Sequence, residues 1–134
     1  MQQLLWLSVC VYDCVRDFNR AASHEGDQSL IRAYRKDGSA EILGIEPTSG
    51  DFSEDIIWID LIKPSREEEH FVEGRIGIQL PTPDELKDIE PSSRLYVENE
   101  AIYMTASLLY RADSTYPLLT DIAFILFRGR LITI

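Results

Sequence analysis

The spacing of apolar residues divides this 134-residue chain into segments of different kinds. Near the start, apolar side chains recur at intervals of three and four between Leu4 and Phe18. Such intervals place side chains on one face of a helix and predict an amphipathic helix over roughly residues 3–20. Residues 21–29 are polar and include a glycine, which is typical of a linker. We therefore interpret residues 1–29 as an N-terminal extension and residues 30–134 as one domain.

The following segments have the pattern of strands. Residues 30–35 alternate in polarity, and residues 40–46 would return after the Asp37-Gly38 turn. An Asp-Gly pair between two such segments predicts a β-hairpin. Residues 56–61 are apolar apart from Asp60, which indicates a strand buried on both faces.

Two helix starts come next. Ser65 is followed three residues later by Glu68, the pattern of a capping box, and Gly77 can end that helix. Thr82 as N-cap and Pro83 at the first helical position predict a second, short helix.

The last third of the chain is rich in β-forming residues. Four segments, 94–98, 101–110, 121–127 and 131–134, are separated by turn-forming residues and predict an antiparallel meander. Together with the preceding segments they indicate an α/β (α+β) fold, a mixed sheet with helices packed on it. The chain stops on the apolar strand 131–134. Because a bare edge strand invites aggregation, we expect a longer protein that continues past Ile134. The alternative is that this strand pairs inside the sheet.

Charge narrows the classes of function. Acidic residues number 23 and basic residues 13, a formal net charge of −10, and the whole excess lies between Glu46 and Glu100. Nucleic-acid binders and proteins that dock on anionic lipid need a basic face, so both classes are excluded. An acidic zone can attract cations or basic partners, although an ordinary solvated surface is the simpler explanation.

Soft metal ligands are sparse. Cys10 and Cys14 lack the Cys and His partners of a zinc site and are expected to be reduced thiols. Glu67 and His70 form one Glu-x-x-His motif, whereas a di-iron site needs two on a helix bundle. No nucleophile with a nearby base can be named, so we expect no enzyme. A small acid-dependent hydrolase is the remaining enzymatic alternative.

Two acids on the short helix form the candidate metal site. Asp84 and Asp88 are four residues apart and would share one helix face. Their oxygens suit Mg²⁺ or Ca²⁺, but such ions take six or more oxygens, so water or another subunit must supply the rest. The alternative is that the acids of the first turn only complement the helix dipole.

An ordered set of segments resembles the N-terminal cytoplasmic domain of CorA-type divalent cation transporters. The resemblance spans roughly residues 30–134, and residues 1–29 match nothing in the family. The segments that carry it are Trp58–Glu69, Gly77–Ile78, Leu80–Thr82, Asp88–Tyr96, Glu100–Ala106 and Arg130–Ile134.

The resemblance implies an α/β/α sandwich at the cytoplasmic face of the inner membrane, part of a homopentameric transporter of Mg²⁺ or, in relatives, Co²⁺, Zn²⁺ or Ni²⁺. It also implies that Asp88 helps to bind a regulatory metal between neighbouring subunits, with its partner acid on a long helix that this chain lacks. Lys87 stands where the studied branch has an acid, which puts a second metal there in doubt.

The same resemblance implies that the chain is a regulatory, metal-sensing fragment that is not itself transport-competent. The family's transmembrane helices and Gly-Met-Asn signature are missing here, so membrane attachment would come only through missing C-terminal helices. We expect no tightly bound cofactor in the fragment. The alternative is a stand-alone α/β interaction module without a transport role. The gene sequence past Ile134 discriminates between these two hypotheses.

Overall fold

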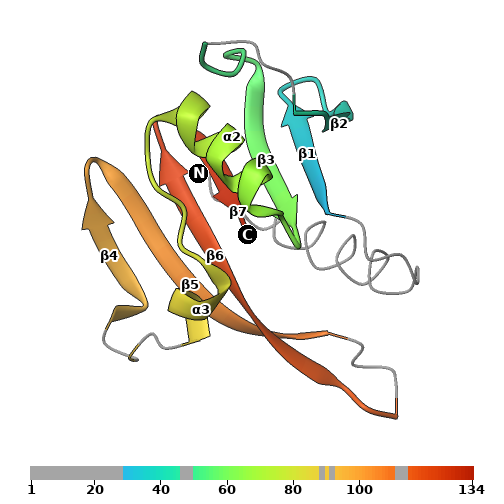
Figure 1. Cartoon of the computed structure of the whole chain (residues 1–134), viewed down its shortest axis with the longest axis vertical. Helices are drawn as coiled ribbons and strands as arrows, with labels where there is room; N and C mark the ends of the chain where they lie inside the picture. The colour runs from blue at the N-terminus through green and yellow to red at the C-terminus, as the bar shows by residue number, and fades with distance from the viewer. Residues whose placement is uncertain (1–28, 46–49, 88–89, 91–92, 111–114) are drawn as a thin grey trace. The chain divides into compact units, whose positions relative to one another are not determined.

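The computed structural model describes residues 29–45, 50–87, 90, 93–110 and 115–134. Seven strands and two helices lie within these ranges (Figure 1). Their bounds are β1 Leu30–Arg35, β2 Ala40–Leu43, β3 Ile56–Ile62, α2 Arg66–Ile76, α3 Pro83–Lys87, β4 Leu95–Glu98, β5 Ala101–Tyr110, β6 Leu118–Phe127 and β7 Arg130–Thr133. The helix predicted over residues 3–20, its linker and both cysteines lie outside the described residues.

The chain forms two compact units. The larger comprises residues 28–107 and 121–134, and the smaller comprises residues 1–27 and 108–120. In the smaller unit the described residues are the adjoining ends of β5 and β6 and the residues just before β6, and several apolar side chains there are exposed, among them Leu109, Tyr116 and Leu119. Everything described below concerns the larger unit.

The sheet is mixed, as the order of predicted elements indicated. Its strands run in the order β2-β1-β3-β7-β6-β5-β4. The β3–β7 pair is parallel, whereas β1–β2, β1–β3, β4–β5 and β6–β7 are antiparallel. The predicted α/β class is therefore confirmed. Residues 131–134 pair inside the sheet, the alternative that the sequence left open, because β7 lies between β3 on one side and β6 on the other.

The first hairpin forms where the Asp-Gly pair predicted it. Gly38 adopts φ 85°, and the Asp37 carboxylate accepts a 2.8 Å hydrogen bond from the Ser39 amide. The Ser39 hydroxyl donates to the same carboxylate at 2.6 Å, and the hydrogen bonds from this hydroxyl and from the amide lower the pKa of Asp37. The returning strand β2 ends at Leu43, three residues earlier than the predicted segment, and is mostly exposed.

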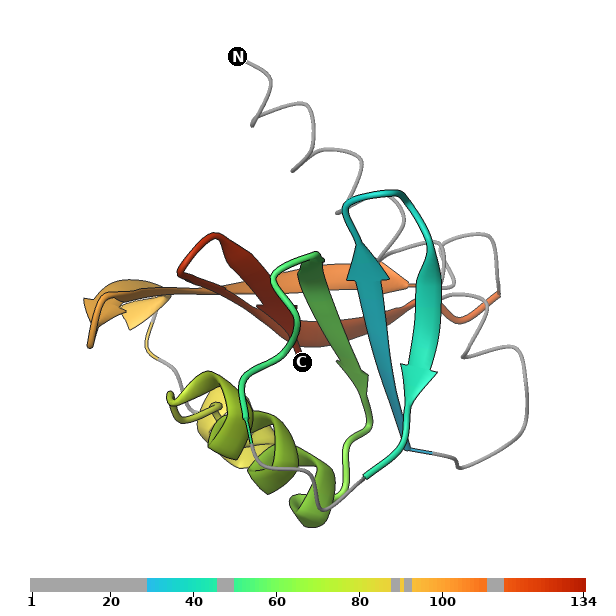
Figure 2. The same cartoon turned by 90° about the horizontal axis from the view of Figure 1, so that it is seen from above.

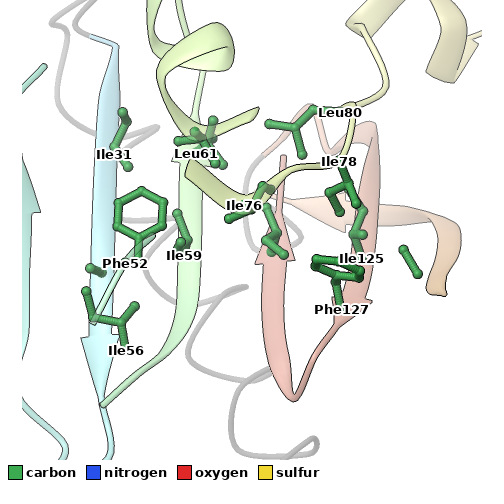
Figure 3. Packing of buried hydrophobic residues seen from close by; sticks show 14 of the residues in the cluster. Ile31, Phe52, Ile56, Ile59, Leu61, Ile76, Ile78, Leu80, Ile125 and Phe127 are labelled. Carbon is green, nitrogen blue, oxygen red and sulfur yellow. The ribbon is translucent and has the colours of Figure 1, made fainter. Parts of the chain in front are cut away.

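The core lies between the sheet and α2 (Figure 3). Ile59 and Leu61 of β3 are buried in the same cluster as Val72 and Ile76 of α2. Trp58, from the opposite face of β3, is also buried, so the prediction of a strand covered on both faces is confirmed. Figure 2 shows α2 and α3 on the same side of the sheet. The described helices thus form one layer, on one side of the sheet.

Helix α2 begins and ends at the predicted residues. The Ser65 hydroxyl accepts from the Glu68 amide at 3.3 Å, and the Glu68 carboxylate accepts from the Ser65 amide at 2.8 Å. Gly77 takes φ 78°, and its amide donates to the Glu73 carbonyl at 2.8 Å. The caps at both ends therefore give hydrogen-bond partners to terminal amide and carbonyl groups that have none within the helix.

Two glycine substitutions in α2 and its cap should act in opposite directions. Gly77→Ala should lower the free energy of unfolding by about 1 kcal/mol, because alanine is strained at positive φ. Gly74→Ala should raise it by about 0.5–1 kcal/mol, because alanine favours a helix interior. No heavy atom lies within 4 Å of a Cβ added at either position. Urea denaturation measures both, and equal shifts of the same sign would contradict the prediction.

Candidate functional site

The candidate metal site lies on α3, and the structure confirms how this helix begins. The Thr82 amide donates to the Glu85 carboxylate at 2.7 Å, and the Thr82 hydroxyl accepts from the Glu85 amide at 3.3 Å. The hydrogen bonds from Thr82, the backbone amide first, lower the pKa of Glu85. Glu85 is therefore a capping residue that stays ionised at neutral pH.

Asp84 faces solvent. Its side chain is 93% exposed, and one carboxylate oxygen lies 3.3 Å from the Lys87 ammonium. Asp88, the other predicted ligand, lies outside the described residues, so its pairing with Asp84 stays a prediction. Among the residues that are described, no three His, Cys, Asp or Glu side chains gather as a metal site would require. Asp84 alone offers too few oxygens for Mg²⁺.

A buried acid lies near α3, and sequence reasoning missed it. Glu69 of α2 is 8% exposed at its side chain, and burial is the main cause that raises its pKa. Arg66, whose guanidinium is 3.7 Å away, opposes the rise, while the nearby carboxylates of Glu73 and Glu85 add to it. The sequence does hold a signal for this burial. Glu69 and the apolar Val72 are three residues apart, so they share one face of the helix, and that face is buried.

Replacing Glu69 by glutamine should change how stability depends on pH. A carboxyl whose pKa is raised by folding binds more protons in the folded state, so it destabilises the protein as pH rises past the ordinary glutamate value. Glu69→Gln removes that titration. The variant should gain stability relative to wild type between acidic and neutral pH, as urea denaturation at several pH values will measure. A constant difference across this range would contradict the assignment.

A separate pocket lies away from the α3 acids. Its volume is about 430 Å³. Its lining comes from Ile76, the Phe127–Arg130 turn and residues before and in β3, namely Lys36, Asp51, Phe52, Glu54, Ile56 and Ile57. Neither Asp84 nor His70 lines it. His70 is exposed, and its ring nitrogen Nδ1 lies 2.7 Å from the Arg66 carbonyl one turn earlier.

Known proteins resemble this chain in both sequence and fold. It is 29% identical over 105 residues to the magnesium transport protein CorA of Haemophilus ducreyi and 30% identical over 105 residues to that of Pasteurella multocida. Each alignment covers 78% of this chain. The soluble domain of CorA from Methanocaldococcus jannaschii superposes with a TM-score of 0.51 over 77% of this chain and 39% of that chain, at 16% identity.

The chain is a CorA-like domain. No family model matches it. The resemblance seen in the sequence is confirmed by the curated relatives, and the α/β class by the shared fold. The CorA-like domain spans about a third of the length of these relatives, since each alignment covers 33% of the relative. Neither helix in the described part of the chain has the length and apolar character needed to cross a bilayer.

Proposed function

We propose that the CorA-like domain is the regulatory, metal-sensing part of a homopentameric Mg²⁺ transporter and lies on its cytoplasmic side. The observation that carries this proposal is the 105-residue likeness to proteins named for magnesium transport. The exposure of Asp84 supports it, because a ligand shared between subunits must be accessible at the surface.

In this mechanism Mg²⁺ bridges adjacent subunits, with Asp88 as the main ligand and Asp84 as its helper on one subunit and an acid of the missing long helix on the other. Removal of the ion leaves carboxylates facing each other. Two such charges about 4 Å apart repel by about 1 kcal/mol in water, and the repulsion repeats around the ring. Low Mg²⁺ would thereby favour the open state and high Mg²⁺ the closed one.

Lys87 tunes this response. Its ammonium already lies 3.3 Å from the Asp84 carboxylate, so an arriving cation must displace it or share the carboxylate. Affinity at this site should therefore be weak, with a dissociation constant of about 1 mM or weaker for the chain alone. Calorimetry with Mg²⁺, Co²⁺ and Zn²⁺ measures it. Submicromolar binding would mean that the chain holds a complete site by itself.

Flux measurements on the full-length product of the gene test the sensing role. We expect Mg²⁺ uptake into proteoliposomes that internal Mg²⁺ inhibits. The double variant Asp84→Ala/Asp88→Ala should need about tenfold more Mg²⁺ for the same inhibition, whereas Lys87→Ala should need less. Glu54→Ala, an exposed acid away from α3, is the matched control and should behave as wild type.

The two parts of the proposal fail separately. Absence of Mg²⁺ uptake by the wild-type protein would overturn the transport role. Normal uptake with unchanged inhibition in the double variant would leave transport intact and overturn the assignment of Asp84 and Asp88.

A further inference from the structure

The pocket beside the β6–β7 turn lies at one end of the sheet, away from α3. Its lining brings together the residue after β1, the loop before β3, the end of α2 and the turn itself. In the sheet order, β3 lies between β1 and the β7–β6 pair. Segments from both sides of β3 therefore bound this turn pocket, and its volume of about 430 Å³ is in the range of small-molecule sites.

The floor of the turn pocket is apolar. Four of its lining side chains are less than 8% exposed and belong to the hydrophobic core, namely Phe52, Ile56, Ile76 and Phe127 (Figure 3). A ligand in the pocket would therefore contact two aromatic rings and two isoleucines. Such a surface favours a molecule with an aromatic or apolar body.

The rim of the turn pocket carries two cations without an acidic partner. Lys36 and Arg128 are exposed, and neither forms an ion pair with any residue that the structure describes. The third cation, Arg130, is already paired with the Asp51 carboxylate. Glu54 is the remaining acid of the lining, so two positive charges and one negative charge are left over. In a chain of net charge −10, this local excess of positive charge favours an anion.

The β6–β7 turn holds Arg128 in a backbone conformation that a long side chain rarely adopts. Phe127 pairs with Arg130, and the residues between them, Arg128 and Gly129, have φ 47° and φ 76°. A hairpin turn with two positive φ values favours Asn-Gly, and a bulky residue at the first position is strained. The Arg128 guanidinium lies over the Phe127 ring, 4.8 Å from its centroid. Strain of this kind is typical of functional sites, and here it keeps a charge beside the apolar floor.

We propose that the turn pocket binds a small phosphate ester, with its aromatic or apolar body on the floor and its phosphate between Arg128 and Lys36. A phosphate monoester carries close to two negative charges at neutral pH, which matches two unpaired cations better than a single carboxylate does. Arginine binds phosphate through its planar fork, and lysine adds a flexible point charge. The Glu54 carboxylate can accept a hydrogen bond from a hydroxyl or amine of the same ligand.

Amide NMR titration of the chain with phenyl phosphate tests the site. We expect a dissociation constant of about 1 mM, because so small a probe makes few contacts, and amide shifts concentrated at the β6–β7 turn and in the loop before β3. Inorganic phosphate lacks the ring, phenol lacks the charge, and benzoate carries a single charge. Each of these three probes should bind at least about fivefold more weakly than phenyl phosphate. No residue of α3 lines the pocket, so the result does not depend on the proposed transport role.

Matched substitutions separate the turn pocket from the general effect of charge. Arg128→Asn and Lys36→Gln should each weaken phenyl phosphate binding about fivefold. Arg128→Asn also gives the turn the Asn-Gly pair that it favours, so urea denaturation should show no loss of stability, which separates a binding role from a structural one. Lys63→Gln removes an exposed cation that does not line the pocket, and this control should bind as wild type does.

Saturation-transfer NMR of phenyl phosphate with the full-length product of the gene tests the pocket in the whole protein. We expect transfer to the ligand, reduced by Arg128→Asn and unchanged by Lys63→Gln. The inference is overturned if phenyl phosphate binds no more tightly than inorganic phosphate or benzoate, or if Arg128→Asn and Lys63→Gln act alike. Binding by the chain but not by the full-length protein would also overturn it, because other parts of the protein would then fill the pocket.

Discussion

Replacing Arg130 by alanine should lower the free energy of unfolding by about 3 kcal/mol, because hydrogen bonds from a charged donor are worth about 1.5–3 kcal/mol and several are lost together. The Arg130 guanidinium donates from Nε to the Ile56 carbonyl at 3.0 Å and from Nη2 to the carbonyls of Phe52 and Ser53 at 3.1 and 3.2 Å. Its Nη1 atom donates to the Asp51 carboxylate at 3.1 Å. One side chain thus joins β7 to the loop before β3.

Two further variants separate geometry from charge. Arg130→Lys keeps the positive charge but loses the planar fork, so it should recover less than half of the stability. Arg128→Ala removes a neighbouring cation of the same turn, whose guanidinium lies 4.8 Å from the Phe127 ring, and should cost under about 1 kcal/mol. Urea denaturation of all three measures the differences. Equal losses at both arginines would contradict the role assigned to Arg130.

Thr133→Val should cost about 2–3 kcal/mol, although valine and threonine have nearly the same shape. The Trp58 indole nitrogen donates to the Thr133 hydroxyl at 2.9 Å, and that hydroxyl donates to the Asp60 carboxylate. All three residues are less than 7% exposed. Valine leaves the indole N–H without this acceptor and the carboxylate without this donor, in a place that water does not reach.

The conservative variant Thr133→Ser identifies the hydroxyl as the cause. Serine keeps both hydrogen bonds and removes one methyl group, which is worth about 0.8 kcal/mol. Thermal and urea denaturation should therefore rank wild type above the serine variant and the serine variant above the valine variant. A serine variant as unstable as the valine variant would assign the loss to packing instead.

Local signals predicted local structure well. The capping box of Ser65 and Glu68, the ending glycine Gly77 and the Asp37-Gly38 turn all lie where the sequence placed them. Each of these features joins residues at most four positions apart, so the backbone conformation follows from side chains within the same turn.

Pairing between strands that are distant in the sequence could not be predicted from these local signals. The sequence left open whether residues 131–134 form an edge or pair inside the sheet, whereas the structure makes β7 an inner strand parallel to β3, whose residues lie more than 70 positions earlier. The pattern of apolar residues in a strand shows which faces are covered but not which strands are its neighbours. The burial of Glu69 was not predicted for a related reason. Acids in the first turn of a helix are usually exposed, and only the packing of α2 shows that this one is buried.

The sequence by itself determined the α/β class, the strands and helices of the described region and the resemblance to CorA-type transporters, because these depend on composition, spacing and ordered motifs. Only the tertiary structure decided the strand order, the burial of Glu69, the fourfold hydrogen bonding of Arg130 and the pocket beside the β6–β7 turn. The physical reason is distance along the chain: Arg130 and Ile56 are 74 residues apart, and only folding brings such groups into hydrogen-bonding range.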